Sequence, residues 1–83
     1  MTRDEIRQAV IAALGDIAPE TDAASIDPAA DVRDALDIDS MDFLNFVIAL
    51  HKELKVDIPE ADSPKLLTIA GATAYLSAKL GAA

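Results

Sequence analysis

Apolar residues in this 83-residue chain recur at steps of three and four, and no stretch alternates between apolar and polar positions. Steps of three and four place side chains on one face of a helix, whereas alternation is typical of a strand. The pattern predicts helices over residues 3–15, from 40 to about 55, and from 69 to 80. The sequence therefore predicts an all-α fold.

Capping residues mark where these helices begin and end. Thr2 and Glu5 have capping-box spacing, in which a hydroxyl and a carboxylate each accept a backbone N–H. Asp39 and Thr68 are typical of the residue that precedes a helix, and they stand before the second and third long helices. Gly15 is predicted to end the first helix, because glycine favours helix termini.

A connection without helical periodicity runs from residue 16 to residue 39. Pro19 and Pro28 remove backbone donors from it, and the only regular element predicted there is a helical turn over 31–36. Apolar residues are spaced along the connection as anchors that would hold it in order over the helices: Ile26, Val32, Leu36 and Ile38.

A short helix is predicted over 63–67, because Ser63-Pro64 has the composition of a cap followed by a first helical residue. The result is a compact four-helix bundle of three longer helices and one short helix, with the long loop between the first two. It is a single domain over 1–83, with a core of about 3–80. The apolar face of the second long helix is assigned to this core: Met41, Leu44, Val47, Ile48, Leu50 and Leu54.

Charge and composition narrow the classes of partner. Fifteen acidic residues against seven basic ones give a formal net charge of −8, which disfavours nucleic acid. The charge suits a partner with a basic patch, or it serves only to keep a small domain in solution as a monomer. No cysteine is present, so thiol chemistry would need an imported sulfur. With no signal peptide and no membrane span in the sequence, we expect a cytoplasmic protein.

Catalysis by the chain itself is not predicted. Ser40 and His51 are the only nucleophile and base worth pairing on one helix, yet about 16 Å of helix rise separates them. His51 is the sole histidine and is expected on the solvated face. With neither cysteine nor the spacing of a calcium loop, no metal site is predicted either.

A set of short motifs in fixed order resembles the acyl carrier protein family from about Glu5 to Leu80. Asp-Ser alone is a weak signal, but the ordered set covers nearly the whole chain. The motifs are Ile26-Asp27-Pro28, Asp39-Ser40-Met41, Ile58-Pro59, and Lys65 with Thr68 and Ile69.

The resemblance implies that Ser40 is esterified by 4′-phosphopantetheine, donated from coenzyme A by a phosphopantetheinyl transferase. It also implies further partners that transfer, condense or ligate acyl or aminoacyl groups held as thioesters, in fatty-acid, polyketide or related biosynthesis. The helix that Ser40 begins would be the docking surface. On it, Asp39 and Asp42 would steer partners, Met41 and Phe43 would add apolar contact, and Asn45 would lie within the same surface.

Departures from the family pattern leave alternatives open. Asp37 stands where the family has glycine, and Asn45, His51 and Lys52 stand where acidic residues are expected. These changes favour a dedicated carrier over a housekeeping one. The apolar stripe is most simply core, although it could open between the second and third helices to shelter an acyl chain. The alternative function is an unmodified acidic adaptor domain with the carrier fold.

Overall fold

The structure is a computed structural model, and it describes residues 1–81. Within this range the chain forms helical segments and no strand, which confirms the all-α prediction. In chain order the segments are α1 (Arg3–Ile17), η1 (Ala23–Ser25), α2 (Val32–Ala35), α3 (Ser40–Leu54), η2 (Glu60–Leu66) and α4 (Ile69–Leu80). The predicted set of three longer helices and one short helix corresponds to α1, α3, α4 and η2.

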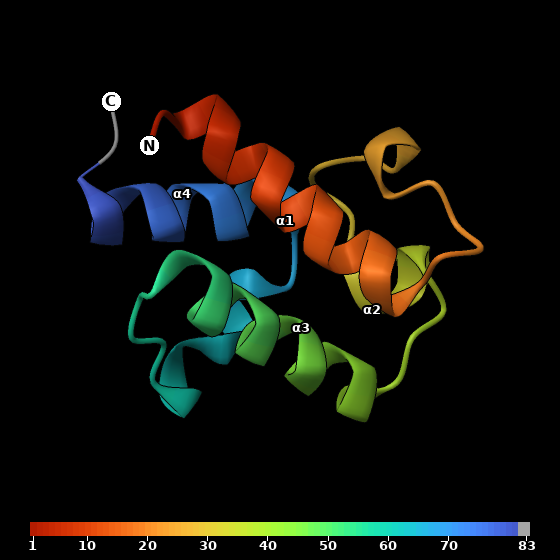
Figure 1. Ribbon diagram of the computed structural model, residues 1–83. Coiled ribbons are helices and arrows are strands. Elements are labelled where there is room, and N and C mark those ends of the chain that lie inside the picture. The colour runs from red at the N-terminus through yellow and green to blue at the C-terminus, as the bar shows by residue number, and fades with distance from the viewer. Residues whose placement is uncertain (82–83) are drawn as a thin grey trace.

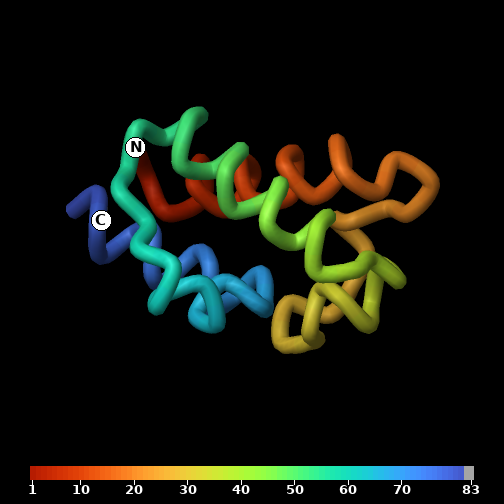
Figure 2. The backbone as a smooth tube through the Cα atoms, turned by 90° about the horizontal axis from the view of Figure 1, so that it is seen from below, coloured from red at the N-terminus to blue at the C-terminus, as the bar shows by residue number. Residues whose placement is uncertain are grey.

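Helix α1 packs against both α3 and α4, and η2 packs against α4. The beginning of α1 and the end of α4 lie at the same end of the molecule in both views (Figures 1 and 2). The first residues of α3 lie at the opposite end, beside the connection that carries α2 (Figure 1). The start of α3 is therefore presented far from the two chain ends.

Helix α1 begins as predicted and ends later than predicted. The Thr2 hydroxyl accepts the Glu5 N–H at 3.2 Å, and the Glu5 carboxylate accepts the Thr2 N–H at 2.8 Å. These bonds hold the pKa of Glu5 below its ordinary value. The expected end at Gly15 is wrong, because the helix continues to Ile17 and closes with the Ala18 N–H donating to the Leu14 carbonyl at 2.9 Å.

The long connection is held in place by buried anchors, as predicted. Val32 and Leu36 are buried, while Ile26 and Ile38 are half-buried against the core. The Val32 N–H donates to the Leu67 carbonyl at 2.8 Å, which ties α2 to the residues before α4. The helical turn predicted over 31–36 is α2, and η1 is an additional short turn.

The short helix η2 begins earlier than predicted. Pro59 rather than Ser63 precedes its first residue, and the Asp62 N–H donates to the Pro59 carbonyl at 2.9 Å. The expected start at Ser63 is therefore wrong, and Pro64 lies inside the helix. Pro59 suits the entry to this helix, because proline has no backbone N–H and its φ is already fixed near the helical value.

Helix α4 begins and ends as predicted, capped by Thr68 and closed by Gly81. The Thr68 hydroxyl accepts the Gly71 N–H at 2.8 Å. A Cβ at Gly71 would lie 2.8 Å from the Thr68 hydroxyl and 2.9 Å from the Lys65 carbonyl oxygen. Glycine is required at this position because η2 approaches the first turn of α4 closely.

The predicted core is wrong for part of α3. Met41, Leu44 and Ile48 are 65%, 47% and 40% exposed, so they lie outside the core. Phe46 is fully buried and is the largest such side chain, although the sequence did not single it out. Successive residues of a helix are rotated by about 100°. With Phe46 pointing inward beside Val47 and Leu50, this rotation turns Met41 to solvent.

Candidate functional site

The first turn of α3 is fixed by its cap. Asp39 has extended backbone angles, and its carboxylate accepts the Asp42 N–H at 2.9 Å. The Asp39 carbonyl accepts the Phe43 N–H at 3.0 Å and so begins the helical ladder. This is the cap that the sequence predicted, and it makes Ser40 the first residue of the helix.

The turn before the cap has a left-handed residue. Asp37 has a φ of 53°, a conformation that favours glycine and that aspartate adopts more readily than most residues. The next N–H, of Ile38, donates to the Arg33 carbonyl at 3.1 Å. The backbone therefore requires the conformation that glycine would supply, and Asp37 adopts it while adding a carboxylate three residues before Ser40.

The Ser40 side chain is exposed. Its hydroxyl makes no hydrogen bond to another atom of residues 1–81 (compare the bonds of the Thr2 and Thr68 caps). The backbone that carries it is held by the Asp39 cap on one side and by the helix on the other. Ser40 is thus a firmly placed hydroxyl that a second protein can reach.

The other residues predicted to contact partners differ in exposure. Asp39, Met41 and Asn45 are exposed, whereas Asp42 and Phe43 are half-buried. The Phe43 ring lies 5.9 Å from the Phe46 ring between centroids, with the planes tilted by 45°. One side of Phe43 therefore belongs to the core, and only its remaining surface can face a partner.

Acidic groups gather around the start of α3. A groove of about 270 Å³ lies between residues 17–21 and residues 36–42, and the Glu20, Asp37 and Asp42 side chains are among those that line it. Within residues 1–81 no group of three or more side chains has the arrangement of a metal site. These carboxylates give the Ser40 end of the molecule a negative character that cations of a partner can approach.

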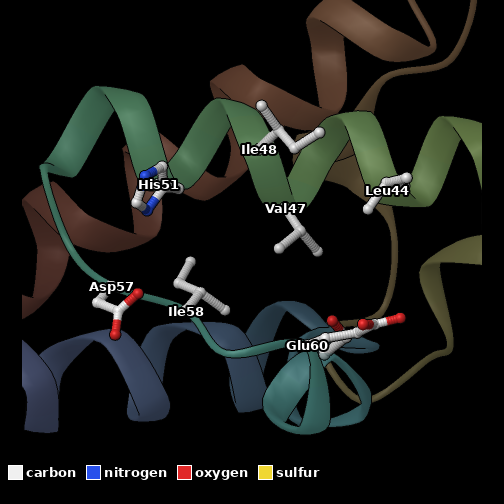
Figure 3. Close-up of a pocket in the computed structure, with 8 residues that line it drawn as sticks. Leu44, Val47, Ile48, His51, Asp57, Ile58 and Glu60 are labelled. Carbon is white, nitrogen blue, oxygen red and sulfur yellow. The ribbon is translucent and has the colours of Figure 1, made fainter.

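A second groove, of about 420 Å³, separates α3 from the residues that follow it (Figure 3). Val47 points into it from α3, and Ile58 points into it from the opposite wall (Figure 3). Its remaining lining residues are Leu44, Ile48, His51, Asp57, Glu60 and Ser63. The groove has an apolar floor and a polar rim, and it begins one helical turn beyond Ser40.

His51 is exposed, as predicted, but it also has a structural contact that the sequence did not reveal. Its Nδ1 lies 2.7 Å from the Val56 carbonyl oxygen, so the N–H at that nitrogen donates to the carbonyl. The chain turns back at Lys55, which has a φ of 53°, and this turn brings Val56 beside the histidine. The left-handed turn could not be found from the sequence because lysine rarely adopts it.

The far wall of the groove is fastened to α4. The Tyr75 hydroxyl donates to the Asp62 carboxylate at 2.6 Å, and the Lys65 and Lys79 ammonium groups lie 5.7 and 5.5 Å from the Tyr75 ring. The hydrogen bond from Tyr75 lowers the pKa of Asp62. Burial, with the bond to Asp62, raises the pKa of Tyr75 to about 12. This contact holds η2 in place across from α3.

Comparisons with known proteins identify the family. A family model described as "Phosphopantetheine attachment site" matches residues 4–76. The chain belongs to this family. An acyl carrier protein of Picosynechococcus sp. is 33% identical over 63 residues, which cover 76% of this chain and 78% of the relative. An acyl carrier protein of Lactobacillus acidophilus is 31% identical over 62 residues, which cover 75% of this chain and 78% of the relative.

Family membership confirms the resemblance that the sequence motifs indicated. It also confirms the carrier function and the covalent 4′-phosphopantetheine group. Within residues 1–81 no helix is long and apolar enough to cross a bilayer.

Proposed function

We propose that Ser40 is the residue that carries 4′-phosphopantetheine, and that the chain presents acyl or aminoacyl groups on this arm to partner enzymes without catalysis of its own. The observation that supports this assignment is an exposed hydroxyl at the first position of a capped helix, within the residues that the family model matches.

The surroundings of Ser40 fit such a group. The hydroxyl has no partner to lose among the described residues, and the exposed start of α3 leaves room for a chain that extends into solvent. The bound arm supplies a terminal thiol that holds the cargo as a thioester. The chain itself supplies the placement of the oxygen, through the Asp39 cap and the Asp37 turn.

Attachment needs an external catalyst. The Ser40 oxygen forms a bond to the phosphorus of coenzyme A that bears the pantetheine, and the bond from that phosphorus to the nucleotide breaks. The base that takes the hydroxyl proton belongs to the transferase, because His51 is about 16 Å of helix rise from Ser40. Asp39 and Asp42 attract cations of that enzyme.

The grooved side of α3 adds a second element to the proposal. The groove lined by Val47 and Ile58 is placed to receive the apolar part of a cargo that folds back from Ser40. We further propose that the carrier works as a monomer in the cytoplasm, where coenzyme A and the transferase are available.

Intact mass after incubation with coenzyme A and a broad-specificity transferase tests the assignment. We expect the wild-type chain to gain the mass of one phosphopantetheine group and Ser40→Ala to gain none while keeping its helical circular dichroism. Ser63→Ala is the matched control, since it removes another serine beside the groove and should gain the group normally. A wild-type chain that stays unmodified, in this assay and in its native host, would support the unmodified adaptor instead.

A further inference from the structure

The outer face of α3 carries no carboxylate, although the chain as a whole has a net charge of −8. On a helical projection Asn45, Ile48 and Lys52 fall within about 40° of Met41, and Leu44 lies about 60° to one side. Asp42 and Glu53 project to another side, and Glu53 lines a small groove against α1. We define the outer face as Met41, Leu44, Asn45, Ile48 and Lys52 of α3 together with Lys55, the residue that follows the helix, and all six are exposed.

Two kinds of chemistry are separated along this face. The half nearer Ser40 is aliphatic, with Met41, Leu44 and Ile48 between 40% and 65% exposed. The far half is cationic, with Lys52 and Lys55. Neither lysine is in an ion pair within residues 1–81. Three exposed aliphatic side chains in a row form an apolar surface of the kind that partner proteins cover. The two lysines beyond them are available to pair with carboxylates of such a partner.

Charge complementarity therefore fixes the orientation in which a partner can dock on this face. Its surface must be cationic where it meets Asp37, Asp39 and Asp42, apolar over the middle of the face, and anionic over the lysines. Lys52 lies about 18 Å from Ser40 along the helix. A transient protein contact of about 600 Å² per partner is roughly 25 Å across, so one partner can cover both ends.

We propose that the enzyme which accepts the acyl group from this carrier docks on the outer face of α3 with carboxylates opposite Lys52 and Lys55. The proposal rests on the proposed function of Ser40. It assigns to the partner a surface of mixed sign, in contrast to the uniformly basic surface that the net charge alone would select. Asp57 and Glu60 lie across the groove and mark the edge where an anionic partner surface must end.

The test uses the chain carrying its arm, loaded with a fluorescent acyl group. The probe is the acceptor enzyme, purified from the native host by its removal of that group from the arm. Lys52→Glu combined with Lys55→Glu should raise the KM for the loaded carrier by roughly tenfold with kcat nearly unchanged, because docking is weakened and the chemistry is not. Lys52→Arg combined with Lys55→Arg should behave like the wild type.

Arg3→Glu combined with Arg7→Glu is the matched control, since it changes the net charge equally but on α1. It should leave KM within about twofold of the wild-type value. Equal effects of the two double reversals would overturn the proposal, because net charge would then explain both. A lower KM for the Lys52/Lys55 reversal would also overturn it, since the partner would then be cationic throughout.

The first step of the same experiment separates this proposal from the assignment of Ser40. A chain that accepts no arm would end both. A chain that accepts the arm and transfers its acyl group with KM insensitive to Lys52 and Lys55 would end only the docking proposal.

Discussion

On the inner face of α3, Phe46 and Leu50 have no exposed surface, whereas on the outer face Met41 and Ile48 are 65% and 40% exposed. All four side chains are large and apolar, and they alternate within ten residues of one helix. Their hydrophobicity does not decide which are buried. The rotation of the helix does, and the burial of Phe46 in the core sets that rotation.

The inner face of α3 stabilises the folded chain, whereas the outer face contributes little to its stability. An 83-residue chain has a small core, so each fully buried side chain contributes strongly to stability. Exposed aliphatic side chains add little to stability and increase the tendency to associate. Their presence beside Ser40 is therefore better explained by contact with partners than by folding.

Truncation of one residue on each face gives the largest expected contrast. Phe46→Ala should lower the free energy of unfolding by about 3–5 kcal/mol, because it leaves a cavity in the centre of the core. Met41→Ala should change it by less than about 0.5 kcal/mol. Chemical denaturation followed by circular dichroism measures both. Similar losses in the two variants would contradict the assignment of the two faces.

The sequence was sufficient for the elements that depend on local chemistry. The sequence predicts the capping box at Thr2, the caps at Asp39 and Thr68, and the loop anchors at Val32 and Leu36, because each depends on residues a few positions apart. The wrong end at Gly15 has a similar cause. Glycine lowers helix stability by up to about 1 kcal/mol, and packing of the neighbouring apolar residues outweighs that cost.

Tertiary packing decided what the sequence could not. Periodicity alone allowed Met41 and Phe46 to exchange places, because both lie on stripes that a helix can bury. The proximity of His51 to Val56 depends on the left-handed turn at Lys55, for which the sequence has no signal. At the site, the position of Ser40 was predictable from its cap, but the groove between α3 and η2 was not.

Removal of the cap tests whether the start of the outer face is held by Asp39. Asp39→Ala should lower the free energy of unfolding by about 1 kcal/mol, because the Asp42 N–H loses its partner. Asp39→Asn should retain most of that stability, since asparagine caps helices as well as aspartate does. If the asparagine variant gains the phosphopantetheine group more slowly than the wild type, the carboxylate also steers the transferase.

In the turn that precedes α3, one substitution is expected to stabilise the chain. Asp37→Gly should raise the free energy of unfolding by about 0.5 kcal/mol, because glycine adopts a φ of 53° without steric cost. Asp37→Ala should lower it, since alanine keeps the Cβ and lacks the polar group that helps aspartate in this region. A glycine variant less stable than the wild type would show that the Asp37 carboxylate makes a contribution larger than the strain.

The smallest expected effect concerns η2, which faces the outer side of α3 across the groove. Tyr75→Phe removes the hydroxyl that donates to Asp62 and keeps the ring that the Lys65 and Lys79 ammonium groups approach. Because the bond lowers the pKa of Asp62 in the folded chain, its stabilisation is present above the ordinary aspartate pKa of about 4 and is lost as pH falls through the lowered value. The difference in the free energy of unfolding between wild type and Tyr75→Phe should therefore be seen at pH 7 and shrink below pH 4.

On the alkaline side this difference should shrink again as pH rises through about 12, where Tyr75 loses its proton in the folded chain. Urea denaturation at pH 7 and pH 3 measures the acid limb, and a difference that does not change with pH would show that Tyr75 holds η2 through its ring alone.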